Sequence, residues 1–150
     1  MSSSAYDGDG VKTSAKHIVK DGVVSSYLLG CYYARKLGLT TTANSGGVFN
    51  LEVSANFNTQ EDLIKEMGTG ILITDFMGSG TNLITGDYSR GASGFWVENG
   101  EIKYPVEEIT IAGKLQEMYE SIIGIAGDVD TRHNIKTGSI LLAEMTVSSN

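Results

Sequence analysis

The sequence is poor in the residues that form covalent or metal-bound frameworks. It has one cysteine, Cys31, and two histidines, His17 and His133, among 150 residues. A single cysteine excludes an internal disulfide and suits a reducing compartment. Because the histidines lie far apart in the sequence, they cannot form the i, i+3 or i, i+4 pair of a helical metal site. We therefore expect both histidines to be structural and expect no metal site in this chain.

Positive charge and long hydrophobic runs are also scarce. Eleven Lys and Arg against eighteen Asp and Glu give a formal net charge of −7. The absence of a basic cluster argues against nucleic acid or an anionic membrane as a partner. No apolar run reaches the roughly 18 residues that span a bilayer. Residues 1–7 lack the basic and apolar regions of a signal peptide. We therefore expect a cytoplasmic protein that binds neither nucleic acid nor membrane.

Apolar residues are abundant enough for a sizeable core. Hydrophobic residues make up 41% of the 150 positions. This length and composition predict a single domain over residues 1–150, with no repeat or linker dividing it. The polar, glycine-containing residues 1–15 are expected to be poorly ordered.

Two dipeptides predict β-hairpins. Asn99-Gly100 supplies the two positive φ angles of a type I′ turn, and Asp21-Gly22 gives a second signal of the same kind. A two-residue turn at 99–100 pairs residue 98 with 101, 97 with 102, 96 with 103 and 95 with 104. This register predicts a core face with four side chains, those of Phe95, Val97, Ile102 and Tyr104.

Periodicity and end signals predict the other elements. Helices are expected over residues 27–37, 60–67 and 115–126, the last with an apolar stripe in the core. Strands are expected over residues 50–55, 70–76, 107–112 and 139–147, and loops over 39–49 and 86–94. The predicted class is therefore α+β and β-dominant, with antiparallel hairpins and two or three short helices packed on the sheet.

Polar side chains lie among closely spaced glycines between residues 78 and 94. Asp87, Ser89 and Arg90 could bring a carboxylate, a hydroxyl and a guanidinium to a pocket. Alternatively, Asp87 and Ser89 cap turns while Arg90 pairs with Asp87. Trp96 either anchors a peptide or protein partner or packs under a neighbouring strand. No phosphate-binding or nucleophile-elbow motif is complete, so these residues favour a binding or scaffold domain.

Three segments together carry a resemblance to a known family. They are residues 32–38 (Tyr-Tyr-Ala-Arg-Lys-Leu-Gly), 65–70 (Lys-Glu-Met-Gly-Thr-Gly) and 85–101, which spans the glycines and the hairpin turn. They resemble the C-terminal domain of the PmbA/TldE subunit type of the TldD/PmbA metalloprotease family. Residues 108–113 and 137–139 extend the match. In that family the domain ends a longer subunit, so the resemblance implies that this chain is a fragment.

The resemblance also implies where the metal is bound. In TldD, the metal is held by an upstream HExxxH motif and by a cysteine that follows an apolar strand and precedes a glycine. Here the corresponding position is Met77, followed by Gly78, and no HExxxH is present. A thioether is a poor Zn²⁺ ligand compared with a thiolate. The resemblance therefore implies the non-metal subunit type, with no cofactor in this chain and zinc or a similar divalent metal in a TldD-like partner.

The implied function is support of metal-dependent proteolysis by a cytoplasmic TldD/TldE heterodimer that cleaves flexible peptides and unfolded protein. This chain would be a component of that hydrolase without a self-contained catalytic site. The predicted substrate or interface residues are Gly78, Gly80, Asp87, Ser89, Arg90, Gly91 and Trp96. The alternative is a non-enzymatic peptide- or protein-binding regulator that uses the Trp96 face, in line with the family's label as a modulator of DNA gyrase.

Overall fold

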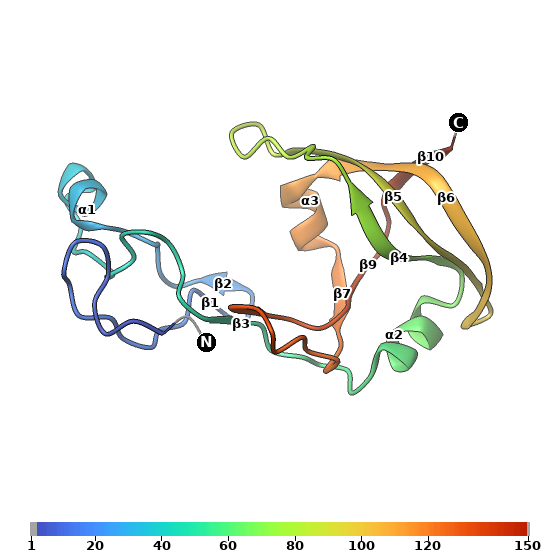
Figure 1. The fold of residues 1–150 in the computed structure, drawn as a ribbon, viewed down its shortest axis with the longest axis horizontal. Helices are drawn as coiled ribbons and strands as arrows, with labels where there is room; N and C mark the ends of the chain where they lie inside the picture. The colour runs from blue at the N-terminus through green and yellow to red at the C-terminus, as the bar shows by residue number, and fades with distance from the viewer. Residues whose placement is uncertain (1–2, 150) are drawn as a thin grey trace. The chain divides into compact units, whose positions relative to one another are not determined.

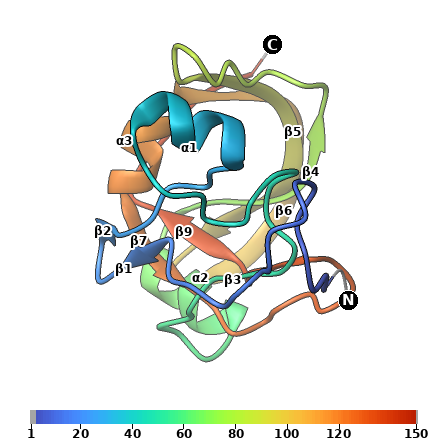
Figure 2. The same cartoon turned by 90° about the vertical axis from the view of Figure 1, so that its left-hand side faces the viewer.

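The computed structural model describes residues 3–149, and the chain divides into two compact units (Figures 1 and 2). Unit 1 combines Met1–Glu52 with Thr131–Lys136, and unit 2 combines Val53–Asp130 with Thr137–Asn150. The described residues contain ten strands and three short helices, which confirms the predicted β-dominant α+β class. The longest of these helices has eight residues, so none could cross a membrane. The single domain over residues 1–150 stays a prediction.

Unit 1 contains the predicted hairpin and helix. Strands β1 (Val19–Lys20) and β2 (Val23–Val24) flank Asp21 and Gly22, whose φ angles are 51° and 77°. Helix α1 (Cys31–Leu37) ends at Gly38, as predicted, with φ 68°. The helix predicted from residue 27 begins instead at Cys31. The backbone N–H of Leu29 donates to Thr42 Oγ1 at 2.7 Å, so this residue is held by the 41–44 loop and does not join the helix.

A parallel pair of strands and a buried carboxylate connect segments of unit 1 that are apart in the sequence. Strand β3 (Leu51–Glu52), shorter than predicted, pairs in parallel with β8 (Ile135–Lys136). The Asp7 carboxylate accepts hydrogen bonds from the backbone N–H groups of Asp9, Val11 and Ser45. The expected disorder of residues 1–15 stays a prediction, and residues 1 and 2 lie outside the described part.

Unit 2 is built on an antiparallel sheet with the strand order β10-β6-β5-β4 (Figures 1 and 2). Its strands are β4 (Gly70–Met77), β5 (Asp87–Glu98), β6 (Glu101–Lys114) and β10 (Thr146–Ser149). The buried core of the sheet is formed by Ala92, Ile109 and Ile111, against which five partly buried residues pack: Ile71, Ile73, Tyr88, Val106 and Met145.

The loop predicted over residues 86–94 is wrong, because most of this segment belongs to β5. Gly91 and Gly94 lie within β5 and allow close contact between strands, whereas Gly86 precedes β5 and has a φ of 75°. A Cβ on Gly94 would lie 1.9 Å from the carbonyl oxygen of Leu72, and Ala92 between the glycines is fully buried. A strand position where another backbone approaches this closely requires glycine.

The predicted hairpin register is correct only next to its turn. Asn99 and Gly100 have φ angles of 55° and 72°, and Val97 pairs with Ile102. A bulge then places Trp96 opposite Tyr104, where residue 103 was expected. The extra residue puts Tyr104 on the same side of the sheet as Trp96, away from Val97, which contradicts the predicted shared face. Ile102 and Tyr104 are about half exposed, whereas Val97 is buried.

The turn of this hairpin contacts helix α2 (Gln60–Met67). Gly100 N donates to the carbonyl oxygen of Gly68 at 2.7 Å, and Figure 1 shows the turn beside α2. The helix has the predicted capping box between Thr59 and Asp62 and ends at Gly68. The local signals for this helix are therefore confirmed.

The helix predicted over residues 115–126 is wrong in its second half. Helix α3 (Leu115–Glu120) ends at Ser121 and buries no residue, so its stripe is not core. Strand β7 (Ile122–Ile125) follows and pairs with β9 (Ile140–Leu142). Its β-branched isoleucines favour a strand, and Gly124 leaves space for the Phe57 ring, which would lie 2.4 Å from a Cβ at that position. The strand predicted over residues 107–112 is part of β6. The strand predicted over residues 139–147 is divided in the structure into two strands, β9 and β10.

Candidate functional site

The loop over residues 78–86 connects the adjacent strands β4 and β5 and contains two of the predicted site residues. Gly78, directly after β4, has a φ of 73°, which favours glycine. Gly80 then lies against the next strand, because Ser89 N donates to its carbonyl oxygen at 2.7 Å. A Cβ on Gly80 would lie 1.5 Å from the carbonyl oxygen of Ser89. Both glycines are therefore required by the backbone of this loop.

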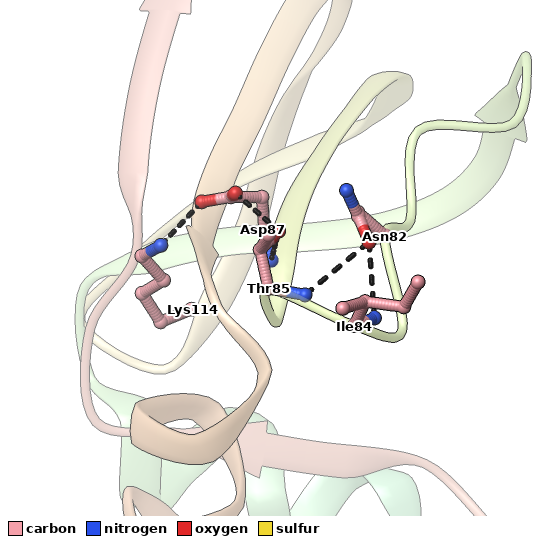
Figure 3. A network of polar contacts seen from close by, with 5 residues as sticks. All are labelled: Asn82, Ile84, Thr85, Asp87 and Lys114. Atoms are coloured by element: carbon pink, nitrogen blue, oxygen red, sulfur yellow. Dashed lines mark hydrogen bonds and ion pairs between the residues drawn. The ribbon is translucent and has the colours of Figure 1, made fainter.

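Asp87 fixes the base of the loop through two side chains (Figure 3). Its carboxylate accepts a hydrogen bond from Thr85 Oγ1 at 2.5 Å and forms an ion pair with Lys114 at 2.5 Å. The hydrogen bond from Lys114, followed by that from Thr85, holds the pKa of Asp87 below its ordinary value. The ion pair considered from the sequence, between Asp87 and Arg90, is thus replaced by one with Lys114.

Asn82 orders the tip of the same loop. Its Oδ1 accepts hydrogen bonds from Ile84 N at 3.0 Å and from Thr85 N at 3.2 Å, as Figure 3 shows. The tip carries Leu83 and Ile84, which are 85% and 96% exposed. These two residues are not among the site residues predicted from the sequence. An asparagine that starts a turn would have been the signal for them.

Arg90 connects the ends of β4 and β5. Its Nη2 donates to the carbonyl oxygen of Gly78 at 2.7 Å, and its guanidinium carbon lies 5.0 Å from the centre of the Phe76 ring. Its Nε is buried and has no hydrogen-bond partner among the described residues. A guanidinium has five N–H donors, so the bond to Gly78 leaves others for a carbonyl or carboxylate.

Met77 lies beside this arginine at the end of β4. It pairs with Gly91 across the sheet, where a Cβ would lie 3.3 Å from the Met77 Cβ, and it is 52% exposed. Among the described residues, no group of three or more His, Cys, Asp or Glu could hold a metal ion. A thioether with such neighbours does not fit a zinc site.

The structure thus brings six of the seven predicted residues together and places Trp96 elsewhere. Trp96 pairs with Ile71, at the opposite end of β4 from Met77. Its ring stacks on Tyr104 with 6.4 Å between centroids and 19° between planes. The glycine-rich end of the β4–β5 hairpin forms the candidate site, formed by Gly78, Gly80, Asp87, Ser89, Arg90 and Gly91.

Comparison with known families gives a match over nearly the whole chain. The model of the PmbA/TldA metallopeptidase C-terminal domain matches residues 1–149. Metalloprotease PmbA of Escherichia coli O157:H7 is 50% identical over 148 residues, which cover 99% of this chain and 33% of the relative. A TldD homolog from Haemophilus influenzae is 26% identical over 83% of this chain and 28% of its own length. The chain therefore spans about a third of the length of the PmbA relative.

Solved structures share the fold. A candidate modulator of DNA gyrase from Thermotoga maritima superposes with a TM-score of 0.90 and 36% identity, covering 98% of this chain and 36% of the other. TldE from Thermococcus kodakarensis superposes with a TM-score of 0.78 over 97% of this chain and 36% of its own. At 21% identity, the second likeness shows the fold alone.

Proposed function

This chain belongs to the PmbA/TldA metallopeptidase C-terminal domain family, and we propose that it acts in the non-metal, TldE-type subunit of a two-subunit protease. The observation that carries the proposal is its much greater identity to PmbA proteins than to the TldD homolog. The thioether of Met77 at the end of β4 supports the same subunit type. The proposed location is the cytoplasm.

The catalytic metal belongs, in this proposal, to a TldD-like partner. The relatives are named metalloproteases, yet the residues around Met77 do not fit a metal ion. Zinc or a similar divalent metal in the partner would activate water for peptide hydrolysis. The contribution of this chain is then binding and positioning, and the proposed substrates are flexible peptides and unfolded protein segments.

The glycine-rich end of the β4–β5 hairpin is the proposed contact with substrate or partner. Strand β4 is at one edge of its sheet, and two of the three residues directly after it, Gly78 and Gly80, have no side chain. An extended peptide can lie along such a backbone and hydrogen-bond to it. Arg90 can bind a peptide carbonyl or carboxylate with donors not used by Gly78.

A second candidate function is non-enzymatic binding of a peptide or protein. It is favoured by the Trp96 ring stacked on a half-exposed Tyr104, since such aromatic pairs often anchor partners. The name of the Thermotoga relative, a candidate modulator of DNA gyrase, agrees with a regulatory role of this kind.

Reconstitution of proteolysis distinguishes the two functions. The full-length subunit that contains this chain and a TldD-like partner are assayed separately and mixed, with an unfolded protein as substrate. The proposal predicts that cleavage by the mixture greatly exceeds the sum of the separate activities. If the partner cleaves the substrate equally well with and without this subunit, the proposal is overturned and non-enzymatic binding is favoured.

A further inference from the structure

A second surface of unit 2 is a groove lined by both polar and apolar residues. Its volume is about 550 Å³, and it lies between the end of β6, α3 and the residues just before β10. The apolar part of the lining, which we call its floor, includes Gly113 between Met118 and Met145. A Cβ on Gly113 would lie 3.6 Å from Met118 Cγ and from Met145 Cε. The floor therefore consists of a bare backbone position flanked by two flexible thioethers.

Three carboxylates border the same groove. They belong to Glu117 and Glu120 on α3 and to Glu144. The cation that lines the groove, Lys114, is already paired with Asp87 at 2.5 Å. Its charge is thereby balanced, so the three glutamates give the groove an excess of negative charge.

The chemistry of the groove favours one type of ligand. Among the described residues, no three carboxylates converge as metal ligands, so a single divalent cation does not suit it. Separated carboxylates beside two methionines match a segment that has both cationic and apolar side chains. Methionines adapt to varied apolar side chains, and grooves of this kind take amphipathic segments. A second copy of this chain is disfavoured because each copy has a net charge of −7.

We propose that this groove docks a cationic amphipathic segment of a partner protein. Its apolar side chains contact Met118 and Met145, and its lysines or arginines lie opposite Glu117, Glu120 and Glu144. Complementary charge speeds association and orients the segment, while the floor supplies apolar contact. The inference goes beyond the proposed protease function and does not require cleavage.

The experiment uses the full-length subunit that contains this chain and a fluorescent peptide of alternating lysine and leucine as the probe. Binding is measured by fluorescence anisotropy at low and at raised salt concentration. The groove variant combines Glu117→Gln, Glu120→Gln and Glu144→Gln. Since each exposed ion pair contributes a small factor, we expect this variant to bind roughly tenfold more weakly. Its affinity should also depend less on salt.

A matched control removes the same charge elsewhere. Glu66→Gln, Glu98→Gln and Glu107→Gln change three exposed glutamates that do not line the groove, and this variant should bind like the parent. In the parent, Met118→Gln should weaken binding of the lysine–leucine peptide, but not of an oligolysine. Equal losses in the groove and control variants would overturn the proposal, because they would show a general charge effect. Absence of peptide binding to the parent, or equally tight binding of oligolysine, would overturn it as well.

Discussion

Arg90 donates a hydrogen bond from Nη2 to the carbonyl oxygen of Gly78 at 2.7 Å, and so joins the first residues of β5 to the residue that follows β4. The contact explains why an arginine lies among glycines in a strand. The backbone must turn at Gly78, and the guanidinium holds the turned carbonyl while it covers the Phe76 ring.

The first prediction concerns this arginine. Arg90→Ala should destabilise the full-length subunit by about 1–2 kcal/mol, because it removes a charged hydrogen bond and a cation–π contact. It should also lower cleavage by the complex with a TldD-like partner by more than the loss of folded protein explains. Thermal melting and peptide cleavage are measured on the same preparations.

Arg90→Lys is the matched control, because it keeps the charge but not the forked donors. It should recover most of the stability but only part of the activity. If Arg90→Ala lowers stability while the folded fraction keeps parental cleavage, Arg90 has only a structural role.

The hairpin turn allows a test that separates backbone strain from packing. Gly100 and Gly22 both have positive φ, 72° and 77°. A Cβ on Gly100 would lie 3.1 Å from Lys65 Cα, whereas nothing lies within 4 Å at Gly22. Valine at either position should cost about 1–3 kcal/mol from strain, and Gly100→Val should cost more because it also pushes against α2. Chemical denaturation of the two variants measures the difference. Equal losses would show that the contact with α2 adds nothing.

Asp7 should make the stability of the chain sensitive to acid. Burial raises the pKa of its carboxyl. Hydrogen bonds from the backbone N–H groups of Ser45, Val11 and Asp9 act against burial and lower the pKa, and the net pKa lies below the ordinary value of 3.8. A carboxyl with a lowered folded-state pKa stabilises the fold above its unfolded pKa. That contribution is lost as the pH falls through the folded pKa.

Asp7→Asn should therefore melt at a lower temperature than the parent at neutral pH, and the gap should narrow below about pH 4. Asp21→Asn is the control, since position 21 has a φ of 51° that asparagine tolerates. Melting temperatures measured from neutral pH to below pH 4 test this. A gap that stays constant over that range would show that the Asp7 carboxylate is not responsible.

Short-range signals were sufficient for the turns and caps. Asn99-Gly100, the Thr59 capping box and the αL glycine after α1 each act on residues within a few positions, so the sequence contains all that defines them. Errors arose where distant partners decide. Residues 122–125 fit a helical period, but β9 offers them a strand partner from far along the chain. Gly94 is explained only by the carbonyl oxygen of Leu72, which no local pattern shows.

The candidate site was predictable as a set of residue types but not in its pairings. Glycine density drew attention to residues 78–94, and the structure brings six of the seven predicted residues to one end of a hairpin. The sequence could not show that Asp87 pairs with Lys114 while Arg90 donates to the carbonyl oxygen of Gly78. The first of these contacts depends on the β5–β6 register, which no local pattern shows.

The central claim is that this subunit supports catalysis while a TldD-like partner holds the metal. The most direct measurement is cleavage of an unfolded protein by two reconstituted complexes. One carries Met77→Ala in this subunit, and the other carries a Glu→Gln change in the HExxxH motif that the family resemblance implies for the partner. We predict that the first complex keeps near-parental cleavage and that the second loses it. Abolished cleavage in the Met77→Ala complex, with assembly intact and with activity surviving in the second complex, would contradict the account.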